Sequence, residues 1–177
     1  NIEGFFNILE ICRKYVPKHL LYASSSSVYG MNNDPPFKID DNTDMPVSLY
    51  GATKKSNEIM AFSYSHLFSI PSTGMRFFTV YGPYGRPDMA YYLFTRAIIE
   101  NEPINVFDRK EMYRDFTFID DVVKAIIELI PLPPGNFDNM QKGIQNFRVL
   151  NIGNNDCVTL EKFISLIELA CGKNAKI

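Results

Sequence analysis

Two short stretches of the sequence carry side chains that can move a proton. Residues 23–30 read ASSSSVYG, and residues 48–54 read SLYGATK. Tyr50 and Lys54 are four positions apart, so on a helix they share one face. A free tyrosine ionises at about pH 10, and a nearby ammonium favours the phenolate. The pair predicts a base that takes a proton from a substrate hydroxyl and returns it, although this spacing also arises by chance on amphipathic helices.

The serine run supplies a second polar group. A serine hydroxyl both donates and accepts hydrogen bonds, so one of the serines at 24–27 could bridge the tyrosine oxygen and a substrate hydroxyl. For most of these serines, the simpler explanation is a strand end whose hydroxyls satisfy their own turn.

Alternating strands and helices must position these side chains. Apolar runs such as HLLYASSS at 19–26 are typical of buried strands, and apolar residues at helical spacing predict the helices. The expected elements are helix 1–15, strand 19–26, loop 30–49, helix 50–68, strand 72–83, helix 89–100, an exposed hairpin or strand pair at 105–118, helix 120–130, loop 131–143, strand 147–153 and helix 159–172. This alternation predicts an α/β layered fold with parallel strands, in which ligands lie beyond the carboxyl ends of the strands.

Composition and charge exclude several classes of protein. With a net charge of −2 and no lysine- or arginine-rich run, the chain lacks the basic face of a nucleic-acid-binding protein. No apolar run reaches roughly 18 to 20 residues, the length of a membrane span, and the first residues do not read as a signal peptide. His19 and His66 lack metal-ligand spacing. Cys12, Cys157 and Cys171 are scattered, which indicates reduced thiols in a cytoplasmic protein rather than disulfides or a zinc site.

Several ordered motifs resemble those of a known family. SSSSVYG at 24–30, YGATK at 50–54 and RFFTVYGP at 76–83 are similar to motifs of the extended short-chain dehydrogenase/reductases, which include the NAD-dependent nucleotide-sugar epimerases and dehydratases. Further segments that resemble this family are NIEGFFNILE at 1–10, RDFTFIDD at 114–121 and LNIGN at 150–154.

The resemblance implies part of a Rossmann-like, doubly wound parallel sheet together with part of a smaller C-terminal substrate-binding subdomain. Residues 1–83 would be the C-terminal half of the NAD-binding Rossmann domain, and residues 84–177 mainly substrate-binding region with returning Rossmann elements. The family's glycine-rich phosphate loop is missing, because the sequence contains no GxxGxxG. We therefore expect the middle and C-terminal portion of a longer enzyme, which alone binds NAD poorly and is inactive.

The resemblance also assigns roles to residues. The catalytic residues that it implies are Ser25, Tyr50 and Lys54. For NAD it implies contacts with Tyr50, Lys54, Phe77, Ala23 and Ser24. For a UDP-sugar it implies contacts with Ser26, Thr79, Arg86 and Arg114, and the guanidinium fork of Arg114 suits the diphosphate. For Arg76 a structural role is the simpler explanation, and no metal is implied.

Two serines narrow the reaction that the resemblance implies. Where related dehydratases carry an Asp and a Glu, and decarboxylases carry a Glu, this chain has Ser26 and Ser27. Simple oxidation and reduction at one carbon remains, which is epimerisation.

A later segment indicates the substrate. GPYGRPDMA at 82–90 resembles UDP-glucuronate 4-epimerases, and Arg86 suits a sugar carboxylate as a bidentate partner; a solvated loop arginine is the alternative. We expect NAD-mediated interconversion of UDP-glucuronate and UDP-galacturonate at C4. A UDP-glucose 4-epimerase, a UDP-glucuronate decarboxylase and a catalytically inert fragment remain open.

The resemblance finally implies a homodimer. The family often dimerises through two helices, here 1–15 and 50–68. Both carry apolar residues on more than one face, which fits a four-helix contact between two copies.

Overall fold

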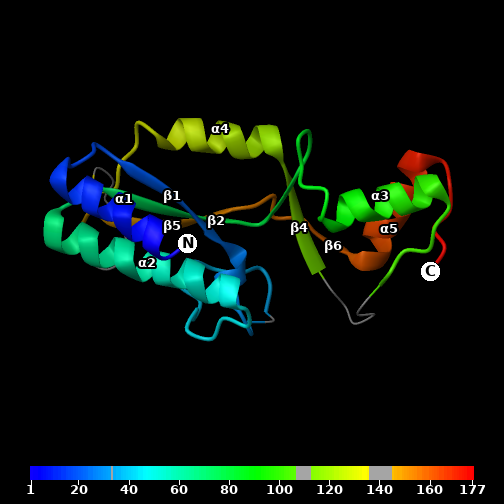
Figure 1. Ribbon diagram of the computed structural model, residues 1–177, viewed down its shortest axis with the longest axis horizontal. Coiled ribbons are helices and arrows are strands. Elements are labelled where there is room, and N and C mark those ends of the chain that lie inside the picture. The colour runs from blue at the N-terminus through cyan, green and yellow to red at the C-terminus, as the bar shows by residue number, and fades with distance from the viewer. Residues whose placement is uncertain (33, 107–112, 136–144) are drawn as a thin grey trace. The chain divides into compact units, whose positions relative to one another are not determined.

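The computed structural model describes residues 1–32, 34–106, 113–135 and 145–177. The chain divides into two compact units (Figure 1). The first unit comprises residues 1–78 and 123–152, and the second comprises residues 79–122 and 153–177. Each unit is therefore built from two separate stretches of chain.

The first unit contains a three-stranded parallel sheet. Its strands are β1 (Leu20–Ser25), β2 (Ser72–Phe77) and β5 (Phe147–Ile152), in the order β1-β2-β5. In the register of the sheet, Ser25 lies beside Phe77, and Phe77 lies beside Ile152. The strands therefore end together at one carboxyl edge, where ligands bind in sheets of this kind.

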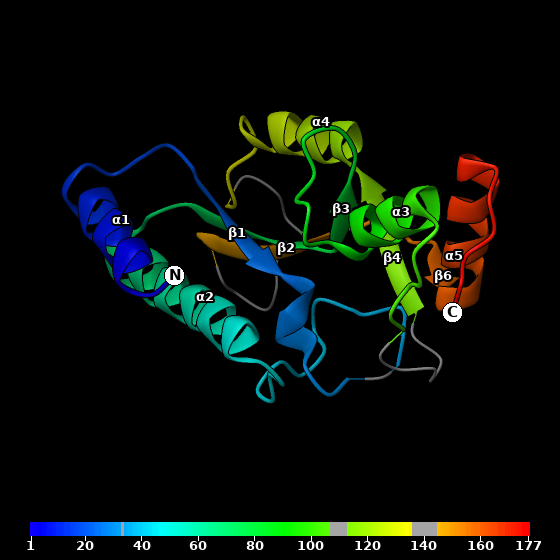
Figure 2. The ribbon, with the colours of Figure 1, turned by 45° about the vertical axis from the view of Figure 1, so that its right-hand side comes forward.

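Two helices pack against this sheet. α1 (Glu3–Lys14) and α2 (Leu49–Phe68) lie side by side in Figures 1 and 2. The core that they share with the sheet consists of Tyr22, Ala61, Phe147 and Val149, with Phe5 and Leu20 packed against it. Burial of these side chains fixes α2 against β1, since apolar area removed from water is the main stabilising contribution.

Local signals define the ends of α2. The helix begins after Ser48, whose hydroxyl accepts a hydrogen bond from the backbone N–H of Gly51 at 3.0 Å. It ends at Ser69, which takes a left-handed conformation with φ of 53°. The cap fixes the first turn of α2, the turn that carries Tyr50.

The second unit is a smaller layer of strands and helices. β3 (Thr79–Tyr81) pairs in parallel with β4 (Tyr113–Phe118), and β4 pairs antiparallel with β6 (Cys157–Thr159). Its helices are α3 (Ala90–Glu100) and α5 (Leu160–Cys171), together with the first residues of α4 (Ile119–Leu129). Its core consists of Ile98, Ile104 and Ile164, with Phe94 and Leu160 among the residues packed against it.

Most predicted elements are confirmed, as is the α/β class with parallel strands. The prediction of one strand over 72–83 is wrong, because this apolar run forms two strands in two sheets. At Phe78 the backbone N–H still bonds to the Ile152 carbonyl at 3.1 Å, and from Thr79 the chain pairs with Phe116 instead. The sequence gives no break where the partner strand changes.

Other differences concern short elements. The segment expected as an exposed hairpin or strand pair at 105–118 lies outside the described residues over 107–112. Its described end is β4, the central strand of its sheet. The 3-10 helix η1 (Ser26–Tyr29) and strand β6 were not predicted. The expected loop at 131–143 lies partly outside the described residues. Among the helices that the structure describes, none is long and apolar enough to cross a membrane.

Candidate active site

Ser25 ends β1 at the carboxyl edge of the first sheet. Its backbone is extended, and its side chain is buried, with 8% exposed. The Ser25 hydroxyl accepts a hydrogen bond from the Ser27 backbone N–H and donates one to the Ser27 hydroxyl, both at 3.2 Å. Ser25 thus caps η1 while its oxygen stays at the strand end.

Tyr50 and Lys54 lie in the first turns of α2. The Tyr50 side chain is half exposed, and the Lys54 Nζ lies 5.8 Å from the centre of the Tyr50 ring. The Lys54 Nζ also donates a hydrogen bond to the Ala23 carbonyl at 3.1 Å. Burial lowers the pKa of Lys54. A partly desolvated ammonium therefore lies beside the phenol ring and is tied to the strand that ends at Ser25.

A glycine allows α2 to approach this strand end. A Cβ on Gly51 would lie 2.7 Å from the Ser27 carbonyl oxygen, closer than a real side chain can be. Gly51 therefore permits contact between the first turn of α2 and η1. The predicted catalytic residues come from these two segments and from the end of β1.

Besides Tyr50 and Lys54, the residues predicted to contact NAD lie on both faces of β1 and at the end of β2. Ala23 is exposed, and Phe77 is half-buried beside Ser25. Ser24 is buried, and its hydroxyl donates a hydrogen bond to Glu58 Oε1 at 2.5 Å. The Ser24 side chain therefore faces α2, the helix that carries Glu58. Because neighbouring strand residues point to opposite faces, the Ala23 side chain lies on the other face of the sheet. Ser26, predicted to contact the sugar, is the half-buried first residue of η1.

Thr79 and Arg114 line a cavity of about 810 Å³ within the second unit. Much of its lining is apolar and comes from α3, β4 and α5, including Leu93, Phe94, Phe116 and Phe163. The volume lies in the range of about 300–1,000 Å³ that small-molecule sites occupy. An apolar cavity with an arginine and a threonine in its wall can hold a ring and pair with an anionic group.

Arg86 belongs to the same unit and is mostly exposed. Its Nε donates a hydrogen bond to Asp88 Oδ1 at 3.0 Å, and its Nη2 pairs with Asp88 Oδ2. The hydrogen bond from Arg86 lowers the pKa of Asp88, and Asp88 also lines the cavity. The guanidinium fork already holds one carboxylate in the geometry expected for a substrate carboxylate.

Two buried acids were not predicted. Asp115 accepts hydrogen bonds from the backbone N–H groups of Asn154 and Asn155, each at 2.9 Å. Glu58 forms a buried ion pair with Arg76 at 2.9 Å. Each acid had a signal in the sequence. Asp115 directly follows Arg114, and Arg76, the partner of Glu58, lies in an apolar strand where a buried arginine requires a partner.

A profile of the NAD dependent epimerase/dehydratase family matches residues 1–141. The chain is 50% identical over 183 residues to "Protein CapI" of Staphylococcus aureus, and 45% identical to a "Probable UDP-glucuronate 4-epimerase" of Rhizobium meliloti. These alignments cover 99% of this chain but 55% and 54% of the relatives. The chain thus spans about half the length of the curated relatives it matches.

Solved structures share the fold. The UDP-glucuronic acid 4-epimerase of Bacillus cereus, crystallised with UDP-glucuronic acid and NAD, matches with a TM-score of 0.85 and 32% identity. The match covers 99% of this chain and 52% of that protein. This match confirms the Rossmann-like α/β fold class that the sequence predicted.

Proposed function

The chain belongs to the NAD dependent epimerase/dehydratase family, and from this premise we propose that it carries the catalytic residues of a UDP-glucuronate 4-epimerase. The reaction is the interconversion of UDP-glucuronate and UDP-galacturonate. The observation that carries the proposal is the Lys54 ammonium, which lies 5.8 Å from the Tyr50 ring and is anchored beside the strand end at Ser25. The likeness to epimerases acting on this substrate supports the choice of sugar.

Three side chains handle the proton in this proposal. Tyr50, as the phenolate, removes the proton from the sugar 4-hydroxyl, and the Ser25 hydroxyl bridges the two oxygens. Lys54 stabilises the phenolate through its charge. When bound, NAD supplies the reversible oxidation at C4. The oxidised sugar then presents its other face, the hydride returns to C4 on that face, and Tyr50 returns the proton to the C4 oxygen.

The residues of this chain fit one end of the cofactor. Phe77 ends β2 at the carboxyl edge of the sheet, and Lys54 bonds to the Ala23 carbonyl of β1. With Ala23, Tyr50 and the backbone of Ser24, whose side chain faces α2, they are proposed to hold the nicotinamide ribose and ring. The sequence contains no GxxGxxG to bind the pyrophosphate. We therefore propose that turnover requires the complete protein and that residues 1–177 alone are inactive.

The second unit is proposed to hold the substrate. Thr79 and Arg114 in the cavity wall would contact the UDP diphosphate, and Arg86 would pair with the sugar carboxylate. Ser26 would contact the sugar. Oxidation at C4 makes the uronate a β-keto acid that loses carbon dioxide readily, so the carboxylate must be held in a pose that disfavours this loss.

The first test is a product assay with the complete protein. It is incubated with UDP-glucuronate and NAD, and the products are separated by chromatography. UDP-galacturonate without carbon dioxide is the expected result. UDP-xylose with carbon dioxide would assign a decarboxylase, and activity on UDP-glucose alone would assign the other epimerase. No product from any of these sugars would contradict the proposal.

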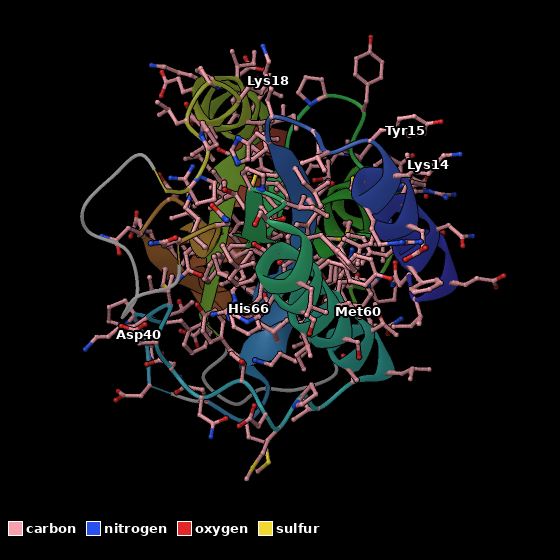
Figure 3. All side chains as sticks on the ribbon, turned by 90° about the vertical axis from the view of Figure 1, so that its left-hand side faces the viewer. Lys14, Tyr15, Lys18, Asp40, Met60 and His66 are labelled. Carbon is pink, nitrogen blue, oxygen red and sulfur yellow. The ribbon has the colours of Figure 1, made fainter. Side chains whose placement is uncertain are left out.

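The first prediction concerns Tyr50. Tyr50→Phe removes the proton acceptor, so kcat is expected to fall by at least about a hundredfold while NAD binding, followed by fluorescence, is retained. Tyr15→Phe is a matched control, because Tyr15 also has a lysine ammonium beside its ring but is not a proposed catalytic residue. The Lys14 Nζ lies 5.3 Å from the centre of the Tyr15 ring at the end of α1 (Figure 3). Normal turnover in Tyr50→Phe would remove the catalytic assignment.

We also propose a cytoplasmic homodimer. Exposed apolar side chains on α1 and α2, including Ile8, Ile11, Ile59 and Leu67, support a contact between two copies. Cys12, Cys157 and Cys171 are free thiols, which supports a reducing compartment.

A further inference from the structure

A buried ion pair lies next to residues of the proposed catalytic trio, which consists of Ser25, Tyr50 and Lys54. Glu58 and Arg76 expose only 4% of their surface. The Arg76 Nε and Nη2 donate hydrogen bonds to Glu58 Oε1 and Oε2, both at 2.9 Å. Burial alone would lower the pKa of Arg76, but the hydrogen bond to Glu58 raises it above its ordinary value. The guanidinium therefore remains charged.

Glu58 connects α2, which carries Tyr50 and Lys54, to β1, which ends at Ser25. On α2, Glu58 lies four residues after Lys54, so the two side chains share one helix face. Lys54 bonds to the Ala23 carbonyl at 3.1 Å, and Glu58 accepts the Ser24 hydroxyl at 2.5 Å. Two consecutive residues of β1, immediately before Ser25, are thus hydrogen-bonded to one face of α2.

Arg76 holds the chain on the other side of Ser25. Arg76 is the register partner of Ser24 in the neighbouring strand. Its Nη1 donates a hydrogen bond to the Tyr29 hydroxyl at 3.0 Å, and its guanidinium lies 4.8 Å from the centre of the Tyr29 ring. Tyr29 ends η1, the segment that follows Ser25. Ser25 is therefore bracketed by contacts that converge on one ion pair.

Further hydrogen bonds make this network rigid. The Tyr29 hydroxyl donates to Asn151 Oδ1 at 2.6 Å, and the Asn151 Nδ2 donates to the Phe37 carbonyl at 2.9 Å. Arg76 Nη1 also donates to the Ile39 carbonyl at 3.3 Å. Polar networks of this kind specify one arrangement of the groups they join, whereas well-packed apolar residues can match a buried ion pair in stability.

We propose that Glu58 and Arg76 are positioning residues that hold Ser25 in place relative to Tyr50 and Lys54. They act through the Ser24 hydroxyl and through Tyr29 rather than by touching the substrate. This inference rests on the proposed epimerase function for its kinetic test, because it concerns the same catalytic trio.

The experiment separates positioning from stability with three variants of the complete protein. Ser24→Ala removes the β1 anchor but leaves the ion pair. Glu58→Leu with Arg76→Met replaces the pair with apolar side chains of similar size. Ser65→Ala is the control, because Ser65 is a buried serine of α2 whose hydroxyl donates to the Asn146 carbonyl at 2.7 Å. Each variant is measured for kcat, KM, thermal unfolding midpoint and the pH profile of kcat/KM.

Ser24→Ala is expected to lower kcat about tenfold or more, with little change in KM and a midpoint like that of Ser65→Ala. The double variant is expected to keep a cooperative unfolding transition, to lose about a hundredfold in kcat, and to show the acidic limb of its kcat/KM profile at higher pH.

Wild-type kcat in Ser24→Ala overturns the proposal, as does wild-type kcat in a folded double variant. If the double variant does not fold, Ser24→Ala decides alone.

A separate readout does not depend on epimerase activity. Hydrogen exchange of the backbone amides at residues 25–29 is measured by mass spectrometry on the complete protein. Loss of the Ser24 anchor or the ion pair is expected to speed this exchange about tenfold or more, and Ser65→Ala is expected to leave it unchanged. If wild-type protein converts no UDP-sugar, the proposed function fails while this exchange still judges the positioning. Unchanged exchange in Ser24→Ala then overturns it.

Discussion

Burial acts in different ways on the tyrosines of the first unit. Tyr50 is half exposed beside Lys54, whereas Tyr22 is buried in the core of the sheet. Within the described residues, the Tyr22 hydroxyl has no hydrogen-bond partner. Burial, and secondarily the charge of Glu58, raises the pKa of Tyr22 well above its ordinary value. Tyr22 therefore buries a polar group without compensation.

Removing this hydroxyl should stabilise the protein. Tyr22→Phe is expected to raise the free energy of unfolding by about 1 kcal/mol, because an unpaired buried donor disappears while the ring stays in place. Tyr29→Phe is the matched control: its hydroxyl is paired with Arg76 and Asn151, so its loss should cost about 1–3 kcal/mol. Urea unfolding measures both, and destabilisation by Tyr22→Phe would contradict the prediction.

His19 belongs to a hydrogen-bonded chain at the start of β1. Its Nε2 lies 2.8 Å from Thr73 Oγ1, which also accepts the Arg148 Nε at 2.9 Å. Its Nδ1 lies 3.2 Å from the Ile130 carbonyl. Burial lowers the pKa of His19, with Arg148 adding to the effect and the Ile130 carbonyl opposing it. The neutral ring is therefore the form that the fold favours.

This network predicts a loss of stability in acid. Because the folded-state pKa of His19 lies below its ordinary value of 6.5, the unfolded chain binds the proton first as the pH falls. The stabilisation by neutral His19 is present above about pH 6.5 and is lost as the pH falls through the lowered value. Urea unfolding between neutral and mildly acidic pH should show a smaller loss for His19→Asn than for wild type. Equal slopes in His19→Asn and wild type would argue against this role.

At the scale of elements, Asp115 fixes the connection between β5 and β6. Its carboxylate holds the backbone at Asn154 and Asn155, and Asn155 has a left-handed φ of 58°. Asp115 neighbours Arg114, which lines the cavity. The turn and the cavity wall are therefore parts of one arrangement within the second unit.

Asp115→Ala should loosen that arrangement. The variant loses two charge-assisted hydrogen bonds from backbone N–H groups and a longer one from the Thr117 hydroxyl at 3.4 Å. We therefore expect a loss of about 2–3 kcal/mol in the free energy of unfolding. We also expect a higher Kd for UDP, measured by calorimetry on the complete protein, because Arg114 loses a fixed neighbour. Asp156→Ala changes an exposed acid in the same turn and should be close to neutral. Equal effects of the two substitutions would show that the carboxylate contacts of Asp115 contribute nothing.

The elements that could be predicted from the sequence are those whose signals are local. Apolar periodicity and caps such as Thr159, whose hydroxyl accepts the Lys162 N–H at 3.2 Å, mark the helices. The short strand β6, and the separation of β3 from β2, depend on pairing with β4, a contact between distant segments, so no local pattern indicates them. Likewise, the spacing of Tyr50 and Lys54 is visible in the sequence, but the partner of Glu58 becomes visible only when α2 packs on β2.

At the scale of the whole molecule, the exposed apolar side chains of α1 and α2 predict a dimer. Ile59→Glu places a charge on this surface, so sedimentation should change from a dimer to a monomer. Leu169→Glu is the control, because Leu169 is exposed on α5 of the second unit. A wild-type monomer, or a dimer unaffected by Ile59→Glu, would rule out contact through this surface.

The order in which the chain builds its units has a consequence for synthesis on the ribosome. The chain leaves the first unit after Phe78 and rejoins it at Val123, and β5 pairs with β2 only once residues 147–152 have been made. While the ribosome adds the intervening residues, β2 can pair with β1 on one side, but its other edge is still unpaired. An unpaired strand edge is the feature that binds other chains and that chaperones shield. The carboxyl edge that carries Ser25 and Phe77 is therefore completed late, when β5 emerges and places Ile152 beside Phe77.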